Sequence, residues 1–168
     1  VLNGQPIYAM GSNVVPCDII PNRINPREER SIIDAAIEAN MNMLRVWGGG
    51  LYASDNFMDY CDAKGILIWH DFMFACAMYP GNEEYLNSVR EEVKYQTQRL
   101  RHHPSLAIWC GNNEVSEGWE RWGWKNGLGE SEVDAVSDSY HELFNELLPN
   151  AVTKYDDAPY WESSPMLG

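Results

Sequence analysis

The sequence predicts an α/β fold in which parallel strands alternate with helices, corresponding to about strands one to five of a (β/α)8 TIM barrel. Short, nearly continuous apolar segments alternate with segments of helical periodicity, as in parallel sheets covered by helices. A complete barrel takes ~250 residues, or ~31 per unit, so 168 residues hold a little more than half of one. The alternative architecture, a doubly wound sheet, would favour a glycine-rich phosphate loop, which the sequence lacks.

The expected elements follow in order along the chain. Strands are expected at residues 5–13, 42–50, 66–74, 106–110 and 158–164, and helices at 25–40, 54–65, 82–103 and 131–148. Asn25 is a suitable cap for the first helix, with Pro26 at its first position. The second helix runs from Ser54 to a stop at Gly65. Pro104 and Pro149 are expected to end the third and fourth helices.

Charge and cysteine content restrict the classes of function. The chain carries 12 basic and 25 acidic residues, a formal net charge of −13, which repels nucleic-acid phosphates and anionic lipid surfaces. No uncharged apolar run approaches the ~18 residues of a membrane-spanning helix. Cys17, Cys61, Cys76 and Cys110 form no C-x-x-C pair, so we expect structural thiols and no metal site.

Polar and aromatic side chains gather where the expected strands end, which is where working residues lie in parallel α/β folds. They are Asn13, Arg45, Trp47, His70, Asp71, Asn112, Asn113, Glu114, Trp161 and Glu162, with Trp119, Trp122 and Trp124 soon after. Tryptophan faces suit the C–H surfaces of sugars, and a few polar groups among them suit a small-molecule pocket. The strand ends therefore predict a pocket suited to a sugar.

These residues also have purely structural interpretations. Arg45 can pair with a surface acid, Asp71 can cap the following loop, and His70 can pack as a buried side chain. His102 and His103 precede the fourth strand, at the opposite rim, where a structural role is expected. A lone glutamate after a strand is usually a helix-start carboxylate favoured by the helix dipole, and this alternative applies to Glu114.

Two longer segments carry a resemblance to a known family. HHPSLAIWCGNNE, residues 102–114, resembles the fourth-strand signature of family 2 glycoside hydrolases, in which Asn-Glu closes the strand. Residues 40–80, from NMNMLRVWGGG to FACAMYP, are similar to the β-mannosidase branch of that family, as is RWGW at 121–124. The resemblance covers residues 4–165, nearly the whole chain.

The resemblance implies a glycosidase that cleaves terminal β-D-mannosides from non-reducing ends with retention of configuration. Glu114 matches the family's general acid/base. Asn113 matches the residue that holds the sugar's 2-hydroxyl, and Arg45 the basic residue beneath the nucleophile. The substrate is expected to be a β-mannoside or a manno-oligosaccharide.

Aromatic walls and one further acid complete the expected site. Trp47 and either Trp119 or Trp124 match sugar-contacting walls of the family. Asp71 and Trp161, at strand ends, are expected to line the same pocket. The mechanism uses carboxyl chemistry in both of its steps, so no metal or cofactor is expected.

The chain departs from the family pattern in one respect. The nucleophile of the family lies on the seventh strand, and no residue here matches it, since Glu162 falls in a substrate-wall segment. We therefore expect residues 1–168 to form a single partial catalytic barrel domain, a fragment of a larger multidomain protein and inactive by itself. Its partners would be the remaining barrel strands and the β-sandwich domains.

Two other functions stay open. A related family 2 enzyme acting on β-galactosides or β-glucuronides would share the same strand-end chemistry. A catalytically inert sugar-binding fragment would keep the tryptophan-lined rim without a nucleophile. The compartment is not decided by the sequence, with cytoplasmic, periplasmic and lysosome-like settings all open.

Overall fold

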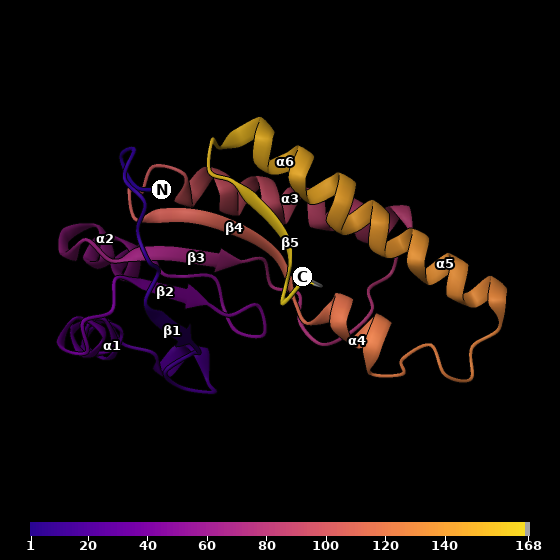
Figure 1. The fold of residues 1–168 in the computed structure, drawn as a ribbon, viewed down its shortest axis with the longest axis horizontal. Helices are drawn as coiled ribbons and strands as arrows, with labels where there is room; N and C mark the ends of the chain where they lie inside the picture. Colours follow the sequence, from indigo (N-terminus) through magenta and orange to yellow (C-terminus); the bar gives the residue numbers. More distant parts are fainter. Residues whose placement is uncertain (167–168) are drawn as a thin grey trace.

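The computed structural model describes residues 1–166 as one five-stranded sheet with helices packed against it (Figure 1). The strands are β1 (Gly11–Val14), β2 (Met43–Val46), β3 (Leu67–Asp71), β4 (Leu106–Asn113) and β5 (Tyr160–Ser164). The helices are η1 (Pro21–Arg23), α1 (Pro26–Glu38), α2 (Asp55–Lys64), α3 (Glu83–Leu100), α4 (Val115–Arg121), α5 (Glu130–Tyr140), η2 (His141–Leu147) and α6 (Leu148–Tyr155).

The strand order confirms the expected partial barrel. All neighbouring strands pair in parallel and follow one another in chain order, β1-β2-β3-β4-β5. A doubly wound sheet would instead reverse its order at a switch point. The arrowheads of β1, β2 and β3 lie on the same side of the sheet in Figure 1, and because β4 and β5 are parallel to them, the residues that follow each strand come to one rim.

Local signals in the sequence set the ends of α1 and α2 as expected. The Asn25 side chain accepts hydrogen bonds from the backbone N–H groups of Arg27 and Glu28. Ser54 accepts one from Phe57 N, and Gly65 ends α2 in the left-handed conformation at φ 73°. These caps satisfy backbone groups that have no partner within the helix.

The first strand begins later than expected, at Gly11 rather than Gln5. The reason is a side chain 32 residues away in sequence. Asn42 accepts a hydrogen bond from Met10 N at 2.8 Å and donates one to Tyr8 O at 2.9 Å. Residues 5–10 thus satisfy part of their backbone with an amide side chain instead of a strand ladder.

Two further expectations are wrong at the C-terminal side. The fourth strand extends to Asn113 rather than ending at Cys110, because Asn112 and Asn113 pair with β5 and Ala75, after β3, forms a parallel bridge to Asn113. The last helix does not end before Pro149 but continues to Tyr155. Pro149 lies in the first turn of α6, directly after the π-helical η2, whose wider turn accommodates the missing N–H.

The hydrophobic core lies between the sheet and the helices. Ile68, Phe72 and Trp109 are fully buried there, and the rings of Phe72 and Trp109 stack with centroids 4.8 Å apart. The Trp109 indole donates a hydrogen bond to Asp156, just after α6, which ties β4 to the helical layer. Apolar packing therefore holds the sheet against the helices, while polar side chains lie at the carboxyl-end rim.

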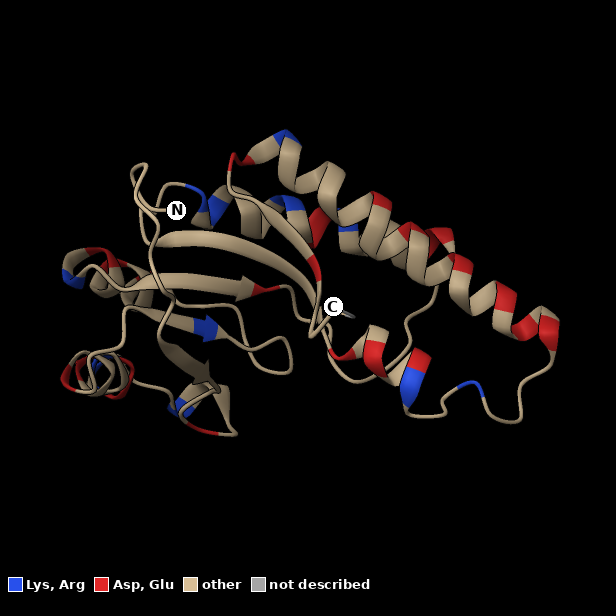
Figure 2. Cartoon of the chain, in the orientation of Figure 1, with Lys and Arg blue, Asp and Glu red and all other residues tan. Residues whose placement is uncertain are grey.

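Acidic residues, red in Figure 2, recur along α5. This helix carries Glu130, Glu132, Asp134 and Asp138 without a basic residue. Such a surface repels polyanions. Over residues 1–166, none of the helices combines the length and the apolar character needed to cross a membrane.

Candidate active site

Four residues from β2, β3 and the end of β4 form one hydrogen-bonded chain at the carboxyl-end rim. The Arg45 guanidinium donates to Asp71 through Nε at 3.1 Å and Nη2 at 2.7 Å. Its Nη2 also donates to Asn113 Oδ1 at 3.0 Å. The Asn113 amide nitrogen in turn donates to Glu114 Oε2 at 3.0 Å. A buried acid is thus connected through a cation and an amide to a second acid.

Asp71 is the buried end of this chain. It has no exposed surface, and four donors surround its carboxylate. Besides the two bonds from Arg45, Trp69 Nε1 donates to Oδ1 at 2.9 Å and Gly48 N donates to Oδ2 at 3.0 Å. Because its oxygens are occupied by protein donors, this geometry makes Asp71 a holder of Arg45 rather than a direct contact for a ligand.

Glu114 stands between β4 and α4 in the left-handed conformation, at φ 63°. Its side chain does not cap α4. Asn112 does so instead, since its Oδ1 accepts from Val115 N at 3.1 Å and from Ser163 Oγ at 2.7 Å. Glu114 thus stands at the start of α4 without making a capping hydrogen bond, and its half-buried side chain turns toward Asn113.

Cys76 is the residue at this rim that the sequence analysis missed. It was expected to be a structural thiol, yet it is exposed, whereas Cys61 and Cys110 are buried. Its Sγ lies 3.4 Å from Glu114 Oε2 and accepts a longer contact of 3.6 Å from Asn113 Nδ2. The signal in the sequence was its position in the loop that follows β3, on the same rim as Glu114.

Partial burial and the hydrogen bond to Glu114 together raise the pKa of the Cys76 thiol. The thiol is therefore protonated at neutral pH and acts as the donor toward the Glu114 carboxylate. This gives Oε2 of Glu114 a second hydrogen-bond donor beside the Asn113 amide.

The four predicted tryptophan walls lie in different environments. Trp161, on β5, is 46% exposed, while Trp119 is only 5% exposed and donates from its indole to Ser137 on α5. Trp124 packs against Gly118 of α4. Trp47 is half-buried and lines a cavity of about 360 Å³ between α1 and α2. Trp119 thus faces α5, and Trp161 presents the most open indole of the four.

Two other strand-end residues face away from the rim chain. His70 is fully buried, accepts from Ala53 N at 3.1 Å and contacts its neighbour's carbonyl, Asp71 O, at 2.8 Å. Glu162 accepts a hydrogen bond from the Tyr140 hydroxyl at 2.6 Å and so turns toward α5. Both side chains serve the packing between sheet and helices.

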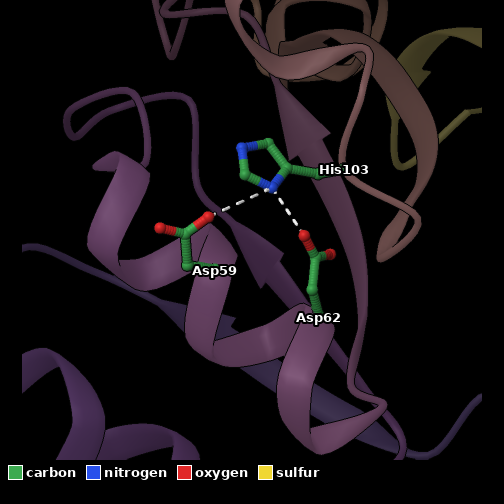
Figure 3. A group of neighbouring side chains, drawn as sticks. All are labelled: Asp59, Asp62 and His103. Carbon is green, nitrogen blue, oxygen red and sulfur yellow. Dashed lines mark hydrogen bonds and ion pairs between the residues drawn. The ribbon is translucent and has the colours of Figure 1, made fainter.

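A second cluster of titratable groups lies at the opposite rim, where α2 meets the start of β4 (Figure 3). Asp59, Asp62 and His103 each offer one ligand atom within 4.8 Å of the others. His103 Nδ1 lies 2.6 Å from Asp62 Oδ2, and Ser105 N donates to Asp62 Oδ1 at 2.9 Å. These hydrogen bonds occupy both oxygens of Asp62. They join α2 to the segment before β4, and we call this arrangement a clamp.

Comparisons with known proteins place this geometry in context. No family model matches the chain. The β-mannosidase of Capra hircus is 51% identical over 113 residues, which are 67% of this chain and 13% of that protein. The β-mannosidase of Rattus norvegicus is 40% identical over 168 residues, 99% of this chain and 19% of that protein.

Solved structures give the same relationship. The β-D-mannosidase from Dictyoglomus thermophilum matches with a TM-score of 0.86 at 41% identity, covering 99% of this chain and 20% of that chain. The β-glucuronidase from Bacteroides uniformis, with a TM-score of 0.78 at 21% identity over 94% of this chain and 18% of its own, shares the fold. This chain thus spans about a fifth of the length of the mannosidases it matches.

Proposed function

Because this chain belongs to the β-mannosidase branch of glycoside hydrolase family 2, we propose that the full-length protein is a retaining, exo-acting β-mannosidase. The observation that carries the proposal is the hydrogen-bonded chain from Asp71 through Arg45 and Asn113 to Glu114. It arranges at one rim the residue types that glycoside hydrolysis requires. The 41% identity to a solved β-mannosidase over nearly the whole chain supports the choice of sugar.

We assign Glu114 as the general acid/base. In the first step it protonates the departing glycosidic oxygen, and in the second it removes a proton from water. We propose that the Asn113 amide, which accepts a hydrogen bond from Arg45, hydrogen-bonds the 2-hydroxyl, a contact that strengthens as the oxocarbenium-like transition state forms. Asp71 keeps Arg45 in place from below. Trp161 and Trp47 would contact the sugar or its aglycone.

The nucleophile would come from the part of the protein outside this chain. A retaining enzyme needs two carboxyl groups about 5–5.5 Å apart. Within residues 1–166, Asp71 is enclosed by its donors and Glu162 is bonded to Tyr140, so neither is free to attack an anomeric carbon. We therefore propose that further barrel strands of the full-length protein complete the site beside Arg45.

Kinetics of the full-length protein test this proposal. Wild type is expected to hydrolyse aryl β-mannosides, and Glu114→Ala is expected to lose turnover by about 10²–10⁴-fold for poor leaving groups. Activated leaving groups need no proton, so their kcat/KM, which reports the first step, should be affected least. Azide, which needs no general base, should rescue the second step in Glu114→Ala and yield β-mannosyl azide. Full activity of Glu114→Ala on poor leaving groups would refute the assignment.

A panel of aryl glycosides decides the sugar. Faster hydrolysis of β-galactosides or β-glucuronides than of β-mannosides would move the protein to a related branch of the family. No hydrolysis of any aryl glycoside, with retained sugar binding, would favour an inert sugar-binding protein.

A further inference from the structure

We infer that the Cys76 thiol is a positioning group for Glu114, fixing one oxygen of that carboxyl so that the other faces the glycosidic bond. The inference rests on the proposed function and adds a residue to it. Glu114 Oε2 accepts from Asn113 Nδ2 at 3.0 Å and from Cys76 Sγ at 3.4 Å. Among the described residues no protein donor reaches Oε1, so this oxygen is the one left to carry the transferred proton.

Backbone hydrogen bonds between residues 74–76 and Asn113 hold Cys76 in this position. Asn113 N donates to Phe74 O at 2.9 Å, and Cys76 N donates to Asn113 O at 3.0 Å. On the other side, Ala75 exchanges two hydrogen bonds with the Tyr79 hydroxyl, at 2.8 and 3.2 Å. The segment is therefore tied both to the end of β4 and to the chain that follows it, which limits the freedom of the thiol.

Backbone strain coincides with this contact. Among residues 1–166, four residues other than glycine have a positive φ: Asn3, Asn40, Cys76 at 49° and Glu114 at 63°. Asparagine tolerates the left-handed region, whereas cysteine and glutamate adopt it at a higher energy. Cys76 and Glu114, the two that are not asparagine, are also the two whose side chains are in contact. Strain of this kind persists where the surroundings enforce it, and it concentrates at working sites.

A purely structural thiol does not account for these observations. Free cysteines that only pack are buried among apolar side chains, as Cys61 is in the hydrophobic core. Cys76 is exposed and directs its sulfur at a carboxylate. Among the described residues, Arg45 is linked to the pair through Asn113, and the Tyr79 hydroxyl is bonded to Ala75, next to Cys76.

Kinetics of the full-length protein test the inference through leaving-group dependence. Cys76→Ala keeps the Cβ and hence the same backbone strain, but removes the donor. We expect kcat/KM to fall about three- to tenfold for aryl β-mannosides with poor leaving groups, and little for activated ones that need no acid. Cys76→Ser keeps a donor and should recover at least half of the loss, and Cys17→Ala, the other exposed cysteine, should change nothing.

Alkylation of the thiol supplies a readout that needs no turnover. Iodoacetamide reacts with the thiolate, which the Glu114 carboxylate disfavours. Glu114→Gln should therefore speed the labelling of Cys76 several-fold near pH 8, measured by peptide mass spectrometry, while Cys17 in the same molecules keeps its rate. Equal rates at Cys76 in both proteins would overturn the contact.

The outcomes separate the two proposals. Wild-type turnover that depends on Glu114, together with an unchanged leaving-group profile in Cys76→Ala, overturns the positioning role alone. A uniform loss for all leaving groups, with no recovery in Cys76→Ser, also overturns it, because it marks a structural defect. A wild type inactive on every aryl glycoside overturns the proposed function and the positioning role with it.

Discussion

Arg45 meets Asp71 with two parallel hydrogen bonds, Nε to Oδ1 at 3.1 Å and Nη2 to Oδ2 at 2.7 Å. The pair joins β2 to β3 at the rim, with the arginine side chain 16% exposed and the aspartate fully buried. This bidentate arrangement fixes the plane of the guanidinium and leaves Nη2 directed at Asn113 as well. The position of the Asn113 amide beside Glu114 therefore depends, through Arg45 on β2, on a carboxylate of the neighbouring strand β3.

Removing the charge of Asp71 should destabilise the protein strongly. Asp71→Asn leaves the Arg45 guanidinium without its counter-charge in a mostly buried site, which is expected to lower the free energy of unfolding by about 3–5 kcal/mol. Denaturant unfolding of the full-length protein, followed by tryptophan fluorescence, measures this. The surface pair Glu83–Arg90 is the control, since both partners are well exposed and Glu83→Gln should change stability by at most about 1 kcal/mol. Equal effects in the two variants would contradict the prediction.

In the cluster of Asp59, Asp62 and His103 at the opposite rim, the half-buried carboxylate should again contribute more to stability than the exposed one. Burial acts to raise the pKa of Asp62, but hydrogen bonds from Ser105 and His103 outweigh it and lower that pKa. Asp62→Asn should lose about 1–3 kcal/mol of stability at neutral pH. Asp59→Asn should lose little, because Asp59 is largely exposed and lies 3.9 Å from the same ring nitrogen.

The sign of the pH dependence follows from the depressed pKa. The contribution of Asp62 is present above its unfolded pKa and is lost as the pH falls through its folded pKa. Wild type and Asp62→Asn should therefore converge in stability toward the acid end of a thermal-unfolding series. A stability gap that stays constant down to about pH 2 would show that the carboxylate charge is not responsible.

The buried, neutral His70 should make the folded protein less stable relative to the unfolded chain in mild acid. Burial lowers its pKa to about 4, so the folded protein resists protonation while the unfolded chain takes up a proton near pH 6.5. Stability linked to His70 is thus complete above about pH 6.5 and declines by about 3 kcal/mol as the pH falls to 4. His70→Gln keeps an acceptor for Ala53 N without a titrating group. Its unfolding free energy should have a correspondingly smaller slope between pH 6.5 and 4, and an unchanged slope would contradict the assignment.

Gly111 lets β4 and β5 approach each other closely. A Cβ at this position would collide with the Tyr160 hydroxyl and the carbonyl oxygen of Glu162. Gly111→Ala should therefore lower stability by about 1–3 kcal/mol and disturb the adjacent Asn112 and Asn113. Gly129→Ala is the matched control, since its Cβ would meet only the Glu132 carboxyl at 3.6 Å. Comparable melting temperatures for the two variants would rule out the predicted collision.

Sequence reasoning succeeded where the deciding interactions are local. The caps at Asn25 and Ser54 and the stop at Gly65 act within one helical turn, so their residues predict α1 and α2 directly. The apolar runs predicted the strands of the sheet, since parallel strands are buried on both faces. The rim residues Arg45 and Glu114 followed from the rule that parallel strands end at one edge.

It failed where distant residues decide. The start of β1 depends on Asn42, 32 positions along the chain, and the Cys76 thiol contacts a carboxylate 38 positions away. The direction of Trp119 toward α5 depends on how that helix packs, which no pattern around Trp119 encodes. Pro149 was predicted to end the helix because no sequence signal indicates the π-helical turn before it.

The left-handed backbone at Cys76 and Glu114 bears on laboratory evolution of this protein. Glycine or asparagine at either site would relax the main chain, by about 1 kcal/mol or more. A screen that selects for thermal stability alone would therefore enrich such replacements. At position 114 it would remove the proposed proton donor while the melting temperature of the protein rose. Only libraries sorted on sugar cleavage as well would retain both side chains.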